Sequence, residues 1–139
     1  MRKIWLAALS LLLVAGDAGA QTVRFFSVMA GSGNVAAATA TATLPGIANR
    51  TTYLCGFLVS GLGATAAQNS NLSITGLAGG TVNISVGIPA GVGVPVSYSV
   101  TLTPSCVPAS ALNTAIVVSI ASFGTGNTNA SITAWGFQY

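Results

Sequence analysis

Residues 71–88, NLSITGLAGGTVNISVGI, contain two short segments in which apolar and polar side chains alternate. In the first, Leu72 and Ile74 alternate with Asn, Ser and Thr; in the second, every other residue from Val82 to Ile88 is Val or Ile. Alternation with a period of two is typical of a strand with one buried face. The glycine-rich stretch Leu77–Gly80 between the segments indicates a turn. The sequence therefore predicts a β-hairpin here.

The same period of two recurs elsewhere in the chain. Residues Val96–Leu102 alternate strictly between apolar side chains and Ser or Thr. Residues Thr51–Val59 and Thr114–Ala121 are more continuously apolar, which is typical of central strands in a two-layer structure. The helix formers Glu, Lys, Arg and Gln are scarce, whereas β-branched residues and Gly are abundant. The pattern predicts an all-β antiparallel sandwich, with the jelly roll as a candidate strand order.

Residues Ala36–Leu44 are low in complexity, because Ala alternates with Thr. We expect an edge strand or an extended arm with little to bury. Thr39, Thr41 and Thr43 would project from one face of such a strand, as rows of threonines do on ice-binding surfaces. A single row makes a weak array, so a solvated edge rich in Thr is the favoured interpretation.

The N-terminus has the pattern of a cleavable signal peptide. Arg2 and Lys3 precede an apolar run of about twelve residues, and small residues follow up to Ala20. The apolar run is shorter than the roughly 20 residues that cross a bilayer, and no later segment is a better candidate for a membrane span. We therefore expect cleavage before Gln21, a single domain over residues 21–139, and a periplasmic, extracellular, or cell- or virion-surface location.

Cys55 and Cys106 are the two cysteines of the chain. An even number of cysteines in an exported protein indicates a disulfide. A redox or metal-binding pair fits poorly, since 51 positions separate the two and no His completes a zinc site. The expected role of this pair is structural.

Residues 21–139 contain no Asp, Glu, His or Lys, and their charged side chains are Arg24 and Arg50. General acid and base catalysis, nucleophile activation and metal-assisted hydrolysis depend on the missing groups. Two separated arginines also make no phosphate-binding patch. We expect no catalytic residues, no metal, no cofactor and no nucleic-acid partner.

One motif resembles a dinucleotide fingerprint but lacks its context. Residues 31–36, GSGNVA, match the glycine spacing in its Gly-to-Ala variant. The fingerprint requires a following helix and an acidic residue about 20 positions later. The Ala/Thr-rich stretch that follows is extended, and no acidic residue is present, so this segment is predicted to be a loop.

Aromatic side chains are the remaining candidates for a ligand or partner surface. In the last segment, Ala130–Tyr139, the alternation places Trp135, Phe137 and Tyr139 on one face. We select Trp135, Tyr139 and Gln138 as the candidate surface, because aromatic rings and amides can bind a neutral sugar without any charge. Most other aromatics are expected in the core, with Tyr53 and Phe57 sharing a strand face with Cys55.

The near absence of charge predicts self-association. Soluble monomeric domains carry about a quarter of their residues as charges and often protect exposed strand edges with Lys or Pro. This chain carries charge on 4% of its residues. A neutral β protein with unprotected edges is expected to pair them, so a homo-oligomer or lattice is predicted.

Several segments resemble a family of short, uncharacterised, β-rich exported or phage- and prophage-associated proteins of bacteria, particularly alphaproteobacteria. The resemblance lies in residues 50–57, RTTYLCGF; 104–110, PSCVPAS; 113–118, NTAIVV; 126–129, GNTN; and 133–139, TAWGFQY. The family has no established activity. The resemblance implies a virion-associated or surface structural role.

Three functional hypotheses follow, of which an enzyme is the least favoured, because a Ser or Thr nucleophile would have no His, Lys or carboxylate to activate it. The first is a non-enzymatic exported structural or assembly protein, such as a surface, appendage or virion-associated subunit. The second is a neutral carbohydrate-binding or adhesion module that uses exposed aromatic side chains, with a glycan or an envelope component as its partner.

Overall fold

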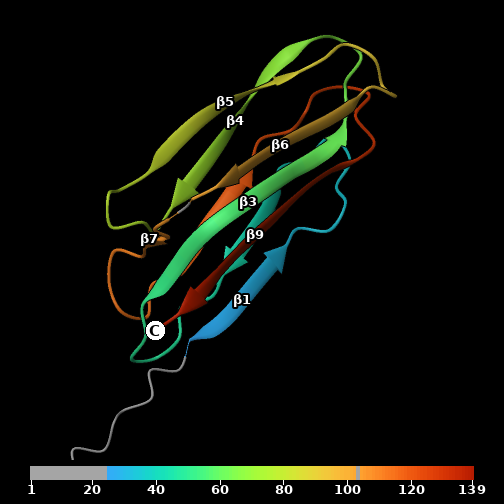
Figure 1. The fold of residues 1–139 in the computed structure, drawn as a ribbon. Helices are drawn as coiled ribbons and strands as arrows, with labels where there is room; N and C mark the ends of the chain where they lie inside the picture. The colour runs from blue at the N-terminus through green and yellow to red at the C-terminus, as the bar shows by residue number, and fades with distance from the viewer. Residues whose placement is uncertain (1–24, 103) are drawn as a thin grey trace, which may run out of the picture.

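The computed structural model describes residues 25–102 and 104–139, so the predicted signal peptide, the boundary at Gln21 and Arg24 lie outside the described residues. The described part folds into two facing antiparallel sheets (Figure 1). The strands are β1 (Phe26–Gly31), β2 (Ala40–Leu44), β3 (Thr52–Leu62), β4 (Gln68–Thr75), β5 (Val82–Ile88), β6 (Pro95–Thr101), β7 (Val107–Pro108), β8 (Ile116–Ile120) and β9 (Ala130–Gln138). The predicted antiparallel sandwich is confirmed.

The strands pair as a long hairpin folded back on itself. β4 pairs with β5, β3 with β6, β2 with β8 and β1 with β9, all antiparallel. Sheet A has the order β1-β9-β3-β6, with β7 also beside β3, and sheet B has the order β2-β8-β4-β5. Nested pairs divided in this way between two sheets give the jelly-roll strand order.

The local predictions for the hairpin and the central strands are confirmed. Leu72 lies opposite Ile84 and Ile74 opposite Val82, as the alternation requires. The loop between them uses Gly76 and Gly80 at positive φ angles of 84° and 89°, which glycine adopts without strain. β3 lies between β9 and β6, and β8 lies between β2 and β4.

The Ala/Thr-rich segment is an edge strand of sheet B, but the expectation that it buries little is wrong. The strand begins at Ala40, and Ala40, Ala42 and Leu44 are fully buried in the core between the sheets. Thr41 and Thr43 are exposed on the other face. Ala is small enough for the two layers to approach closely here, so its methyl groups fill the available space.

A β-bulge in β3 changes the residues that face the core. Leu54 lies opposite Gly136 on β9, and Gly56 lies opposite the adjacent residue Trp135. Cys55 has no partner of its own on β9 and is the extra residue of the bulge. The alternation reverses across such a bulge. Phe57 therefore points into the core, with 1% of its surface exposed, whereas Tyr53 lies on the outer face. The expectation that these two aromatic side chains share a face is wrong.

The predicted disulfide is present and lies at this bulge. Cys55 is bonded to Cys106, with the two Cα atoms 4.3 Å apart. Both β6 and β7 pair with the same side of β3, and the chain leaves that side between them. Leu102 N donates to Cys55 O at 2.8 Å, and Ala109 N donates to Thr52 O at 2.7 Å. The disulfide therefore ties the chain to β3 where the strand pairing is interrupted.

Replacing both cysteines, by Cys55→Ala and Cys106→Ala, is expected to lower the free energy of unfolding by about 4 kcal/mol. The disulfide joins residues 51 positions apart, and without it the unfolded chain gains conformational entropy. Urea denaturation followed by far-UV circular dichroism measures the change. An unchanged unfolding midpoint would contradict a stabilising role for this bond.

Candidate functional site

The outer face of sheet A carries the exposed aromatic side chains. Trp135 and Phe137 alternate with core residues on β9, and Tyr139 continues the pattern beyond the strand. Thr51 and Tyr139 exchange backbone hydrogen bonds of 2.8 and 3.1 Å, which extend the pairing of β3 with β9. The prediction that these three aromatic side chains share a face is confirmed.

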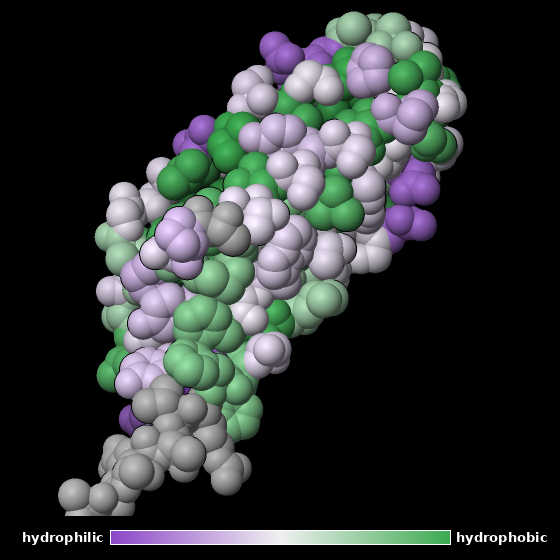
Figure 2. Space-filling view, viewed as in Figure 1, coloured by the Kyte–Doolittle hydropathy of each residue, from purple (hydrophilic) through white to green (hydrophobic). Residues whose placement is uncertain are grey.

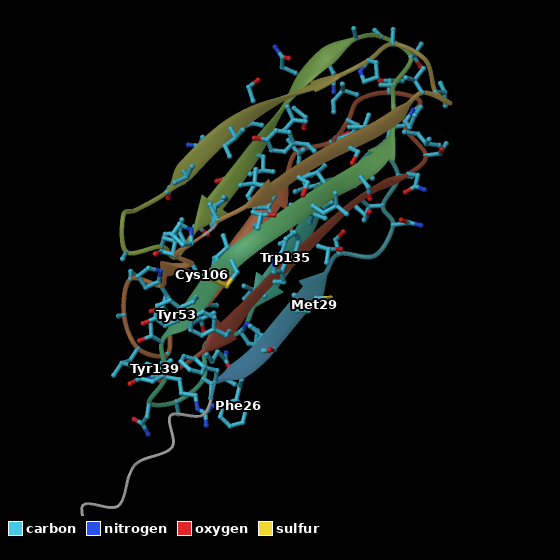
Figure 3. The ribbon with its side chains drawn as sticks, viewed as in Figure 1. Phe26, Met29, Tyr53, Cys106, Trp135 and Tyr139 are labelled. Atoms are coloured by element: carbon cyan, nitrogen blue, oxygen red, sulfur yellow. A yellow bond between two sulfur atoms is a disulfide. The ribbon has the colours of Figure 1, made fainter. Side chains whose placement is uncertain are left out.

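Four of the rings form an aromatic cluster, which consists of Phe25, Tyr53, Phe137 and Tyr139. The Tyr53 and Phe137 rings are stacked, with centroids 4.6 Å apart. Phe25 meets Phe137 edge-on at 5.3 Å and stacks on Tyr139 at 5.7 Å. The cluster lines an apolar hollow of about 400 Å³. Figure 3 places Tyr53 and Tyr139 toward the end of the sandwich where the described chain begins.

Trp135 occupies the middle of the outer face, over the backbone of β3. A Cβ atom added at Gly56 would lie 2.5 Å from Cζ2 and 2.7 Å from Cε2 of the Trp135 indole. The indole therefore lies across the glycine and covers backbone that has no side chain of its own. Met29, opposite Trp135 on β1, has 75% of its surface exposed.

Gln138 is not part of this surface, which corrects the sequence-based selection. Its side chain points into the sandwich and is 1% exposed. Its Nε2 donates hydrogen bonds to Pro45 O at 2.6 Å and to Thr52 Oγ1 at 3.3 Å. Gln138 directly follows Phe137, and neighbouring residues on a strand point to opposite faces. The amide therefore fixes the β2–β3 connection to β9.

Sequence reasoning missed Phe25 and Met29 as members of this surface and assigned Tyr53 to the core. Phe25 and Tyr139 are more than half exposed, at 65% and 54%. Phe25 precedes β1 and Met29 lies on it, and β1 joins the face only through its pairing with the last strand. The alternation around Phe26–Gly31 is too weak to indicate that pairing from the sequence.

Charge is nearly absent from this end of the molecule. Arg50 carries the only charged side chain within residues 25–102 and 104–139. Its guanidinium carbon lies 3.8 Å from the centroid of the Phe26 ring, in cation–π contact. Figure 2 shows strongly hydrophilic side chains only at the margins of this view. The described residues therefore place little charge on this face.

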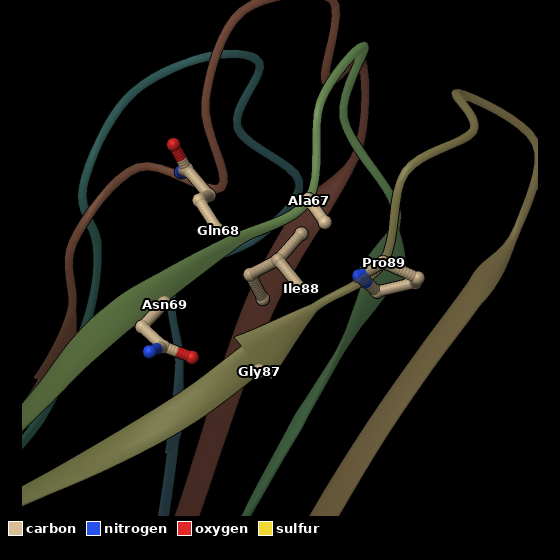
Figure 4. A pocket seen from close by; sticks show the side chains of 6 residues that line it. All are labelled: Ala67, Gln68, Asn69, Gly87, Ile88 and Pro89. Atoms are coloured by element: carbon tan, nitrogen blue, oxygen red, sulfur yellow. The ribbon is translucent and has the colours of Figure 1, made fainter.

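A second hollow, with a volume of about 510 Å³, lies where β4 begins and β5 ends (Figure 4). Its polar side chains are the amides of Gln68 and Asn69. Adjacent strand residues point to opposite faces, so these amides do not converge on one ligand. Gln68 Nε2 already donates to Ser122 O at 3.2 Å. This hollow offers little for specific recognition.

Neither a metal cluster nor a membrane helix occurs in the described part. Residues 25–102 and 104–139 hold no group of three or more His, Cys, Asp or Glu side chains that could bind a metal ion. The same residues form no helix long and apolar enough to cross a membrane. The disulfide fits an oxidising, non-cytoplasmic environment.

The chain matches no protein-family model, no curated protein and no solved structure.

Substitution Gly56→Ala is expected to lower the free energy of unfolding by about 1–3 kcal/mol, because the new methyl group overlaps the Trp135 indole and Val100 O. Gly79→Ala is the matched control, since no atom lies within 4 Å of a Cβ built at that loop position. Urea denaturation of both variants measures the difference. Equal midpoints would show that Trp135 does not lie against Gly56.

Proposed function

We propose that this protein is a non-enzymatic, exported structural subunit that assembles with copies of itself on a cell surface, an appendage or a virus particle. The observation that carries the proposal is an exposed, uncharged aromatic surface that continues directly into an open strand edge.

The exposed residues have the composition of an interface. The most exposed apolar side chains near the cluster are those of Met29, Phe25 and Tyr139. Aromatic residues and Met are enriched at protein interfaces, whereas the cores of interfaces are depleted in charge. Monomeric soluble proteins rarely leave contiguous apolar patches exposed unless they use them. A protein partner with an equally uncharged surface fits this face.

The strand edges on the same side of the sandwich are also unprotected. β1 and β2 are the edge strands of sheets A and B. Neither contains a charged residue or a proline. Natural proteins usually protect such edges against pairing with another chain. Edge strands without a charged residue are consistent with a protein that associates with its neighbours.

The chemistry and the fold also agree with this proposal. Residues 21–139 lack every carboxylate, imidazole and amine side chain, which are the groups most often used in general acid and base catalysis. Jelly rolls occur in viral capsid proteins and in lectins. Fold alone does not determine function, and this analogy supports both hypotheses equally.

A neutral carbohydrate-binding module is the second candidate, and the position of Trp135 favours it. The indole lies over Gly56, and the hydroxyl-bearing residue Thr101 is opposite Gly56 on β6. A sugar ring could stack on the outward side of the indole and accept hydrogen bonds from nearby hydroxyl groups. Tyr53 and Phe137 are less suitable, because each covers one face of the other.

The mass of the exported protein in solution tests the structural proposal. Light scattering is expected to give a discrete multiple of the mass of residues 21–139, because the uncharged face and edges associate. Intact mass spectrometry of the same sample checks the start at Gln21 and the disulfide. A monodisperse monomer at high concentration would contradict self-assembly.

A glycan array tests the second candidate. Selective binding that Trp135→Ala abolishes and Leu58→Ala retains would support a carbohydrate module, since both side chains are on sheet A but only the indole offers a stacking face. No selective binding across the array is the result expected of a structural subunit.

A further inference from the structure

The open edge of β1 presents backbone groups in a defined order. Ser32 N donates to Ile132 O at 2.9 Å, in the same register as the β1–β9 pairing. Hydrogen-bonded positions alternate along an antiparallel pair. Val28 and Ala30 therefore direct their N–H and C=O groups toward β9. Ser27, Met29 and Gly31 direct theirs away from the sheet.

The same three residues place their side chains on the outer face of sheet A. Ser27 lies opposite Phe137, Met29 opposite Trp135 and Gly31 opposite Thr133. Small residues thus flank the exposed Met29 on both sides. A strand added beside β1 would cover the Met29 side chain and bond to all three residues.

The other edges are less suited to such pairing. β6 begins with Pro95, which has no N–H group to donate. After β6 ends, the chain leaves β3 near the disulfide. β5 presents Asn83, Ser85 and Gly87 on its outer face, so pairing there would bury mainly polar groups. β2 has five residues and is followed directly by Pro45. β1 combines open backbone groups with an exposed apolar side chain.

We propose that β1 pairs antiparallel with β1 of a second copy, about a two-fold axis at Met29. This interface rests on the self-assembly proposed above and identifies the surface that mediates it. Ser27 of each copy then lies opposite Gly31 of the other, and the two Met29 residues face each other. This register pairs all three outward-directed residues, whereas an axis at Ser27 or Gly31 leaves part of β1 unpaired.

The pairing makes one continuous sheet from the two copies of sheet A. A row of side chains then crosses the axis in the order Trp135, Met29, Met29, Trp135, because Met29 and Trp135 are neighbours within each copy. Met sulfur atoms make favourable contacts with aromatic rings. The aromatic clusters of both copies lie on the same extended face. An isologous contact of this kind closes as a dimer.

Two lysine substitutions test the interface by light scattering. Met29→Lys places like charges opposite each other at the axis and is expected to reduce the mass from the two-copy to the one-copy value. Ser85→Lys is the matched control, since it adds the same charge at an exposed position on the outer face of the β5 edge and should keep the two-copy mass. Circular dichroism of both variants verifies folding.

Met29→Cys supplies an independent readout. Cys55 and Cys106 are bonded to each other, so the added thiol should form a disulfide between the two copies under mild oxidation. Ser97→Cys, on the same face but on β6, should remain uncross-linked.

The outcomes separate the interface from the proposed function. Assembly that persists in Met29→Lys, together with no cross-linking through Met29→Cys, overturns the β1 interface and leaves self-assembly intact. A wild-type protein that is monomeric at all concentrations overturns both. Loss of the dimer in Met29→Lys alone, with cross-linking of Met29→Cys, supports the pairing.

Discussion

The extra residue Cys55 in β3 determines which side chains of this strand face the core and which face outward. β3 pairs with β9 on one side and with β6 and β7 on the other. Before the bulge, Leu54 points into the core and Tyr53 points out; after it, Phe57 points in and Gly56 points out. The bulge therefore places Tyr53 in the aromatic cluster and gives Trp135 a glycine to lie across. The disulfide from Cys55 fixes the chain at this point.

The two faces of sheet A have different roles as a result. The inner face packs against the apolar side chains of sheet B, which include Ala40 and Ala42 of β2. The outer face carries the aromatic cluster at one end and hydroxyl groups at the other, where Ser60 and Ser131 are hydrogen-bonded at 2.8 Å. Arg50, which lies against the Phe26 ring, is the only charged side chain in the described residues, so little charge opposes contact between two such faces. A neutral, partly aromatic surface next to an open edge accounts for the proposed assembly.

Local patterns predicted much of this fold. The hairpin of residues 71–88, the central strands and the disulfide follow from alternation, apolar content and an even number of cysteines. The bulge was not predictable, because it is a property of the register between β3 and β9. The burial of Ala40 and Ala42 depends on how closely the layers approach, which composition does not show. Gln138 was predictable: the alternation that exposes Phe137 and Tyr139 turns the residue between them inward.

Hydrogen exchange of the β1 amides, followed by NMR at low and high protein concentration, tests the pairing of β1 with a second copy. Val28 and Ala30 donate to β9 within one copy, so their amides should exchange slowly at both concentrations. The Met29 amide should exchange rapidly in dilute protein and slowly in concentrated protein, because the proposed pairing gives it an acceptor in the second copy. Rapid exchange of the Met29 amide at every concentration would contradict this pairing.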